Sequence, residues 1–134
     1  MKVFLHKLVR RGFSVSQLRT AARIREAVEA WVLDKGYTRP LAGGREVAAD
    51  IGVPADQLTL FIRKEAGMPL LSWRKKLRIR EAQQLLIDHP ELPLSVIGEM
   101  VGIDDKSNFR RQFIDETGMS PRQWRARKTR EGKP

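Results

Sequence analysis

Apolar side chains recur at every third or fourth position through most of this chain, which is the spacing of amphipathic helices. Residues 16–36 carry one such stripe, which is predicted to end near Gly36. A proline and paired glycines follow within residues 37–44, so that segment is predicted to be a loop. Another helix is expected to begin at about residue 45, with Val47 and Ile51 on its apolar side.

Residues 70–89 are predicted to form one long connecting helix. Strong helix formers dominate this segment, and Pro90 stands where the helix would have to end. Six apolar positions are available for its inward stripe: Leu70, Trp73, Leu77, Ala82, Leu85 and Leu86. At about 1.5 Å per residue, such a helix spans roughly 30 Å.

One sequence pattern occurs twice in the chain. Its first part repeats at an offset of fifty, with Val47, Ile51, Gly52 and Val53 matched by Ile97, Val101, Gly102 and Ile103. Its second part repeats at an offset of fifty-one, with Leu58, Ile62, Glu65, Gly67, Met68, Trp73 and Arg74 matched by Phe109, Phe113, Glu116, Gly118, Met119, Trp124 and Arg125. A register this long implies two copies of one supersecondary unit.

Each copy has the pattern of a helix-turn-helix. A short helix, at about 45–51 and again at about 95–101, ends at a glycine suited to the left-handed conformation. A turn then leads into a longer helix at about 55–66 and 105–117. The predicted fold is therefore all-α, with two helix-turn-helix subdomains, about 45–67 and about 95–118, joined by the connecting helix.

Charge restricts the class of partner. The chain of 134 residues has 26 Lys and Arg against 16 Asp and Glu, a net charge of +10, with basic tracts near both ends. Such tracts favour a polyanion, either nucleic acid or an acidic membrane surface. The apolar run near residue 1 is interrupted by His6 and Lys7 and is too short for a signal-peptide core or a membrane span. We therefore expect a soluble cytoplasmic protein.

Catalysis and metal binding find no support in the residues. The chain has no cysteine, which excludes disulfides, thiolate zinc sites and thiol nucleophiles. His6 and His89 are the only histidines and lack companions at metal-ligand spacing. We therefore expect no enzyme activity, no metal and no cofactor.

Two sets of residues carry a family resemblance. The first set lies within the predicted connecting helix and consists of Arg78, Ala82, Leu85 and Leu86. The second set lies nearer the C-terminus and consists of Phe113, Gly118, Ser120, Pro121, Trp124 and Arg125. Together they closely resemble the DNA-binding domain of AraC/XylS-type bacterial transcription regulators. The resemblance implies seven helices and sequence-specific binding of double-stranded DNA, as expected of a regulator, either an activator or a repressor, that contacts RNA polymerase.

The resemblance also implies which residues face DNA. In the first recognition helix they are Asp56, Gln57, Thr59, Leu60 and Arg63. In the second they are Lys106, Ser107, Asn108, Arg110 and Arg111. The chain departs from the family pattern at Leu60, where an arginine is common, and at Ile114, where a lysine is usual. The second helix is therefore expected to make most of the hydrogen bonds, and the first to contribute apolar contacts or a reading of DNA shape.

Several residues have two possible roles. Of Arg110 and Arg111, one is expected to contact bases and the other phosphates. The connector cations Arg74, Lys75, Lys76, Arg78 and Arg80 form either a phosphate-facing strip or internal salt bridges to Glu81 or Asp115, and the resemblance favours a structural role for Arg78. Ser120 and Pro121 suit a helix start, where the exposed amides could meet a phosphate. The aromatic residues Trp73, Phe109, Phe113 and Trp124 are expected in the core.

Residues 16–134 are predicted to form the DNA-binding domain, and residues 1–15 a basic segment or linker. Regulators of this family usually carry an N-terminal sensing or dimerising region, so this chain is either part of a longer regulator or a free-standing one. A connecting helix of roughly 30 Å would suit two recognition helices in successive major grooves, about 34 Å apart. Two other functions are compatible with these features. One is a targeting arm of a DNA-repair methyltransferase, in which the lack of cysteine excludes methyl transfer by this chain. The other is a polyanion binder without sequence preference.

Overall fold

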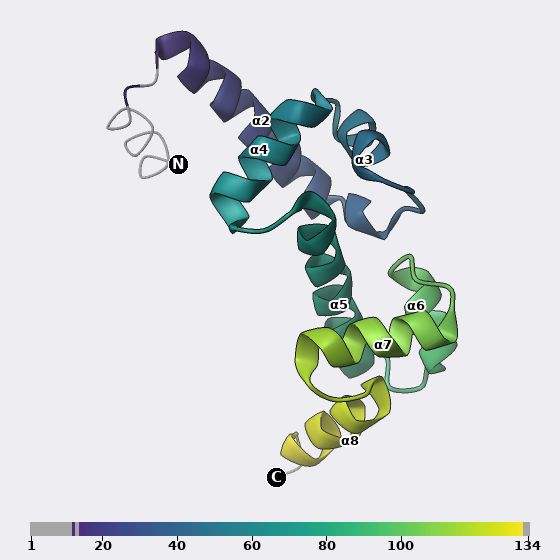
Figure 1. The fold of residues 1–134 in the computed structure, drawn as a ribbon. Coiled ribbons are helices and arrows are strands. Elements are labelled where there is room, and N and C mark those ends of the chain that lie inside the picture. The colour runs from purple at the N-terminus through teal and green to yellow at the C-terminus, as the bar shows by residue number, and fades with distance from the viewer. Residues whose placement is uncertain (1–11, 13, 133–134) are drawn as a thin grey trace. The chain divides into compact units, whose positions relative to one another are not determined.

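The computed structural model describes residue 12 and residues 14–132, so the predicted basic segment 1–15 lies largely outside it. Within these residues the chain forms seven α-helices, one 3-10 turn and no strand (Figure 1). The helices are α2 (Val15–Leu33), α3 (Gly44–Ile51), α4 (Ala55–Ala66), α5 (Leu70–Asp88), α6 (Leu94–Met100), α7 (Lys106–Thr117) and α8 (Pro121–Glu131), with the 3-10 turn at Gly36–Thr38. The expected all-α class and the two helix-turn-helix units are confirmed.

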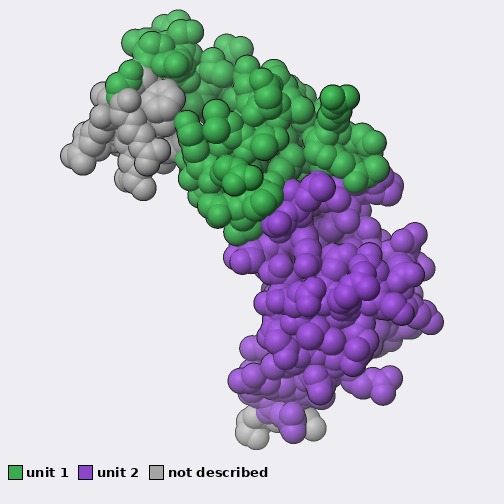
Figure 2. All heavy atoms as spheres, in the orientation of Figure 1, with its two compact units in different colours: residues 1–36, 42–70 green, residues 37–41, 71–134 purple. Residues whose placement is uncertain are grey.

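The chain divides into two compact units (Figure 2). The first comprises residues 1–36 and 42–70, and the second comprises residues 37–41 and 71–134. Each unit holds one helix-turn-helix, α3–α4 or α6–α7. The short segment 37–41 belongs with the second unit although it precedes α3 in the chain.

The predicted glycine turns are present in both copies. The backbone of Gly52 has φ +91° and that of Gly102 has φ +87°, the left-handed region that side chains disfavour. At the next turn, each recognition helix ends at a left-handed glycine, Gly67 after α4 and Gly118 after α7. The sequence repeat therefore marks a repeat of backbone conformation.

In the first unit, α2, α3 and α4 share one core. The buried side chains of α2 are Ile24, Val28 and Trp31, and those of α3 are Val47 and Ala48. From α4 the buried side chains are Leu58 and Ile62. Two polar contacts connect the helices: Trp31 Nε1 donates to Asp50 Oδ2 at 2.7 Å, and Arg25 pairs with Glu65 at 3.1 Å.

In the second unit, nine buried residues from α5 to α8 form one cluster. They are Ile79, Ala82, Leu86, Ile97, Val101, Ile103, Phe109, Phe113 and Trp124. The ring of Phe113 packs edge-on against Phe109 and Trp124, with centroids 6.0 and 6.1 Å apart. This cluster holds the inner face of α7 and leaves its opposite face to solvent.

The predicted stripe of α5 needs two corrections. Ile79, which was not in the stripe, is 1% exposed and is central to the cluster. Trp73 and Leu77 are only half-buried, so the expectation that Trp73 is a core residue like Trp124 is wrong. Arg78, beside Ile79, also points inward and binds two loop carbonyls, so the buried side of α5 includes both residues.

The two copies fill the same core position with different pairs of side chains. In the first, Ala48 and Leu58 are both buried, and in the second the repeat places Gly98 and Phe109 there. A Cβ on Gly98 would lie 3.2 Å from Cγ of Phe109 and 2.7 Å from the Ile103 carbonyl oxygen. The larger ring thus requires the smaller partner, since protein cores leave no room for an extra methyl group.

Candidate nucleic-acid interface

Helix α7 begins and ends at well-defined caps. The Asp105 side chain accepts a hydrogen bond from the backbone N–H of Asn108 at 2.7 Å, and Gly118 closes the helix in the left-handed conformation. Phe109 and Phe113 are buried on one side. Because they occupy the inner face, the polar residues between them must lie on the outer face or its flanks.

The residues predicted to face DNA on α7 lie at its surface. Lys106, Ser107, Arg110 and Arg111 are exposed, and Asn108 is half-buried. Arg111 is oriented by its neighbour, because its Nη2 donates to Asn108 Oδ1 at 2.8 Å. One helix therefore presents a lysine, a serine, an amide and two arginines at its surface.

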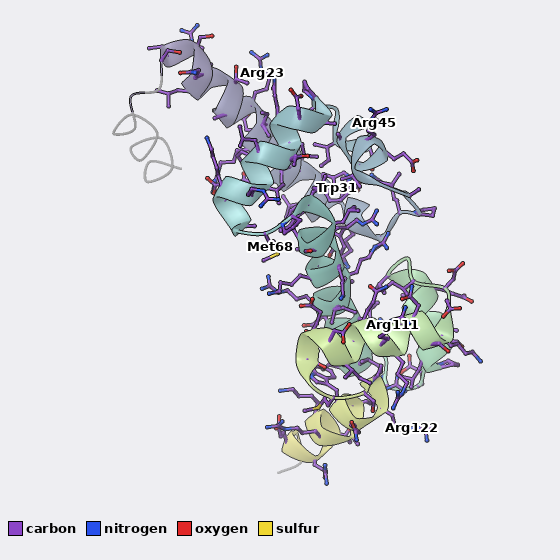
Figure 3. The ribbon with its side chains drawn as sticks, viewed as in Figure 1. Arg23, Trp31, Arg45, Met68, Arg111 and Arg122 are labelled. Carbon is purple, nitrogen blue, oxygen red and sulfur yellow. The ribbon has the colours of Figure 1, made fainter. Side chains whose placement is uncertain are left out.

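Arg110 and Arg111 line different hollows on the two flanks of α7. Arg110 lies with Lys106 and Arg122 in a groove of about 570 Å³ between α6, α7 and α8. Arg111 lies with Asn108 and Lys75 in a smaller polar hollow of about 340 Å³ between α5 and α7. Figure 3 shows Arg111 on α7 and Arg122 at the start of α8. Successive residues on a helix point about 100° apart, and here that separates the two arginines.

Helix α4 presents a different chemistry. The predicted residues Asp56, Gln57, Thr59, Leu60 and Arg63 are all exposed, and the Leu60 side chain is 53% exposed although it is apolar. The Thr59 hydroxyl donates to the Ala55 carbonyl at 2.9 Å within the helix. The surface is therefore open, but it has few side-chain donors.

Charge is distributed oppositely on the two recognition helices. At an offset of fifty-one, Lys106 corresponds to Ala55, Arg110 to Thr59 and Arg111 to Leu60. The first turn of α4 carries Asp56 and no cation, and its basic residues stand in its last turn. The first turns of α7 carry three cations. A polyanion is thus attracted far more strongly to the beginning of α7.

Three of the connector cations bind internally. Arg78 is buried and donates through Nε to the Tyr37 carbonyl and through Nη2 to the Arg39 carbonyl. Arg74 Nη1 donates to the Leu41 carbonyl at 2.6 Å, and Lys75 Nζ lies 3.6 Å from Asp115. Of the two predicted acidic partners, Asp115 takes one of these cations. Glu81 accepts a hydrogen bond from the Tyr37 hydroxyl.

Burial shifts the pKa values of this internal cluster. Desolvation, with a smaller contribution from the charge of Arg74, lowers the pKa of Arg78 to about 10. Desolvation, assisted by the charge and hydrogen bond of Glu81, raises the pKa of Tyr37 to about 12. At neutral pH, Arg78 remains charged and Tyr37 protonated, so both keep the segment 37–41 attached to α5.

The repeat extends to an interaction that the sequence analysis missed. Arg125 Nη2 donates to the Leu92 carbonyl at 2.8 Å, just as Arg74 donates to the Leu41 carbonyl. Arg125 follows Arg74 by fifty-one residues, and Leu92 follows Leu41 by the same number. The register therefore relates both the donors and the acceptors of the two hydrogen bonds, although the sequence does not signal a bond to a backbone carbonyl. Arg125 is thus a structural residue, not part of a free basic tail.

The remaining cations of α8 differ in availability. Arg127 and Lys128 pair with Glu131 at 3.1 and 3.2 Å, and Lys128 also lies over the Trp124 ring. Arg122 and Arg130 are exposed. As predicted for the start of this helix, Ser120 caps it with Pro121 in the first turn, and Gln123 completes a capping box.

The described residues include no group of three or more His, Cys, Asp or Glu side chains that could hold a metal ion. None of the helices in this part of the chain is both long and apolar enough to cross a membrane.

Comparison with known proteins identifies the family. Residues 47–127, more than half of the chain, match the model of a helix-turn-helix domain. The arabinose operon regulatory protein of Salmonella typhimurium is 36% identical over 80 residues, which is 60% of this chain and 28% of that protein. This chain belongs to the AraC-type helix-turn-helix family. The AraC-type resemblance drawn from the sequence motifs is confirmed.

Other AraC-type relatives agree. The transcriptional activator RhaR of Cronobacter sakazakii is 38% identical over 68 residues, covering 51% of this chain and 24% of the relative. The solved C-terminal domain of AraT, a response regulator from Geobacillus stearothermophilus, has a TM-score of 0.67 and 29% identity, covering 78% of this chain and 84% of that one. The chain spans less than a third of the length of the curated relatives it matches. It is a DNA-binding domain of the kind that transcription regulators carry.

Proposed function

We propose that this AraC-type domain binds duplex DNA sequence-specifically through the exposed faces of α4 and α7. The observation that carries the proposal is the surface of α7, where Lys106, Ser107, Arg110 and Arg111 are exposed while Phe109 and Phe113 are buried. Arginine donors match the acceptors of guanine in the major groove, and an asparagine amide matches adenine. A helix held from behind by aromatic packing presents these groups with little loss of entropy on binding.

The two arginines have separate roles in this proposal. Arg111 reads a base, because the 2.8 Å hydrogen bond from its guanidinium to Asn108 holds it in a defined orientation before DNA arrives. Arg110 contacts the phosphate backbone, because it lies on the other flank with Lys106 and Arg122. Sequence-specific contacts then depend on Arg111, and backbone contacts on the cations around Arg110.

Helix α4 contributes in a different manner. Its exposed Leu60 and Thr59 suit van der Waals contact with thymine methyl groups, and Gln57 is able to pair with adenine. Asp56 repels phosphate at the start of α4, so close backbone contact is expected near the helix end, where Arg63 and Lys64 stand. Most of the affinity therefore comes from α7, and α4 adds selectivity.

The two recognition helices occupy successive major grooves in this proposal. The length of α5 supports it, since its 19 residues extend about 28 Å, close to the roughly 34 Å of one turn of B-DNA. The site would then be bipartite, with two half-sites about one helical turn apart.

The wider role is that of a bacterial transcription activator in the cytoplasm that contacts RNA polymerase and is not an enzyme. Support comes from the regulators among its relatives, such as the activator RhaR. Those relatives are more than three times as long as the segment they share with this chain. We therefore also propose that a sensing or dimerising region accompanies this domain in the working regulator.

Selection of bound duplexes from a random pool tests the function and the geometry together. We expect enrichment of a bipartite site, and affinity that falls steeply with salt because about 5–8 phosphate counterions are released. An unenriched pool with salt-sensitive binding would show a polyanion binder without sequence preference. A nearly flat dependence of log affinity on log salt would contradict nucleic-acid binding altogether.

A further inference from the structure

The groove between α6, α7 and α8 combines an apolar floor with a basic rim. Its apolar wall comes from Leu94, Ile103, Phe109 and Pro121. Lys106 and Arg110 of α7 and Arg122 of α8 line the same groove, against a single acidic residue, Asp104. Figure 3 shows Arg122 projecting from the first turn of α8.

The three cations of the groove have no salt-bridge or hydrogen-bond partner among the described residues. Within the part of the chain that the structure describes, Lys106, Arg110 and Arg122 make no ion pair and no side-chain hydrogen bond. Most other cations of α8 have partners. Arg125 donates to the Leu92 carbonyl, and Arg127 and Lys128 pair with Glu131. Three like charges in one hollow repel one another, which favours an anion between them.

Folding does not require this charge. At the equivalent positions of the first copy, fifty-one residues earlier, the chain has Ala55, Thr59 and Leu71 in place of the three cations. The same helix-turn-helix pattern is thus built with no basic residue at any of these positions. The N-terminus of α8 alone does not account for anion binding, because the Ser120 hydroxyl already accepts a hydrogen bond from the Gln123 backbone N–H. The basic rim is an addition to the second copy alone.

We propose that this groove seats one phosphate of the DNA backbone, with its deoxyribose against the apolar floor, and that Arg122 is a DNA-contact residue outside both recognition helices. The inference rests on the proposed DNA binding. It adds the start of α8 to the interface and assigns Arg122 a sequence-independent, affinity-determining role.

The test compares Arg122→Ala with Arg130→Ala in the full chain. Both remove one exposed cation from α8, but only Arg122 lines the groove. Affinity is measured by fluorescence anisotropy on the selected duplex and on an unrelated duplex of equal length, over a range of salt. Arg122→Ala should weaken binding roughly fivefold on both duplexes and reduce the log–log salt slope by about 0.9. Arg130→Ala should change neither measurably.

A scan with methylphosphonate linkages, which neutralise single phosphates, then locates the contact. One position should weaken the wild type as much as the Arg122→Ala change does, and should have no further effect on that variant. If Arg122→Ala and Arg130→Ala behave alike, or if no linkage shows this coupling, the groove is not a phosphate site. Failure of the proposed function is distinct, because the wild type would then show no salt-sensitive binding to either duplex. Circular dichroism confirms that the variants are folded.

Discussion

Replacing Gly98 by alanine tests the packing that positions α7. Gly98 is buried in α6, and the added methyl group would lie 2.7 Å from the Ile103 carbonyl oxygen and 3.2 Å from Cγ of Phe109. The carbonyl belongs to the backbone of the turn and the ring to the first helical turn of α7. The methyl group is therefore accommodated only if α6 and α7 move apart.

Two opposing effects decide the magnitude. Alanine favours a helix interior over glycine by about 1 kcal/mol. Overpacking a core against groups that cannot swing away costs typically 1–3 kcal/mol, and a contact with backbone falls toward the upper part of that range. The net loss should be about 1–2 kcal/mol of unfolding free energy. For a chain of this length that lowers the melting temperature by roughly 3–8 °C.

Thermal and urea unfolding, followed by circular dichroism, measure the change. Gly44→Ala is the matched control, because that helical glycine would place its methyl group at an ordinary 3.5 Å from Leu70 Cδ2. It should be neutral or slightly stabilising. The first copy supplies the second control, since Gly98→Ala combined with Phe109→Leu recreates the alanine–leucine pairing of Ala48 and Leu58.

The double variant separates the two contacts. Phe109→Leu alone should cost about 1 kcal/mol through lost contact with the Phe113 ring. Combined with Gly98→Ala, the total should be smaller than the sum by at least about 0.5 kcal/mol, because the ring contact has been relieved. If Gly98→Ala stabilises the protein as helix propensity alone would, or if the two changes are additive, the argument about packing is refuted.

Three further outcomes are expected. Arg111→Ala should cost about 1–3 kcal/mol on the selected duplex and relax one base position, and Asn108→Ala should do the same more weakly; equal loss on random duplexes would assign Arg111 to phosphate. Tyr37 is the only tyrosine, so absorbance near 295 nm should show it titrating near pH 12, and Glu81→Gln should lower that pKa. Because the folded pKa is raised, the associated stability is present below pH 10 and lost as pH rises through about 12. Arg78→Lys should cost about 2–3 kcal/mol in urea unfolding, since an ammonium cannot satisfy both carbonyls; wild-type stability would contradict the clamp.

The sequence alone predicted the helices and their repetition because these depend on local chemistry. Apolar spacing set the inner faces of α4 and α7, and Gly52 and Gly102 marked turns that need a left-handed backbone. A repeated register conveyed more than either copy could, because chance matches do not persist over so many positions. The family resemblance followed from the same residues.

The partners of the long cationic side chains were decided only by the tertiary structure. Arg74, Arg78 and Arg125 have the same chemistry in the sequence as Arg122, yet three of them bind carbonyls and the fourth lines an open groove. Their acceptors are backbone carbonyls, which every residue possesses and no residue type signals. Whether an arginine meets a carbonyl or solvent depends on which loop the fold brings within its reach.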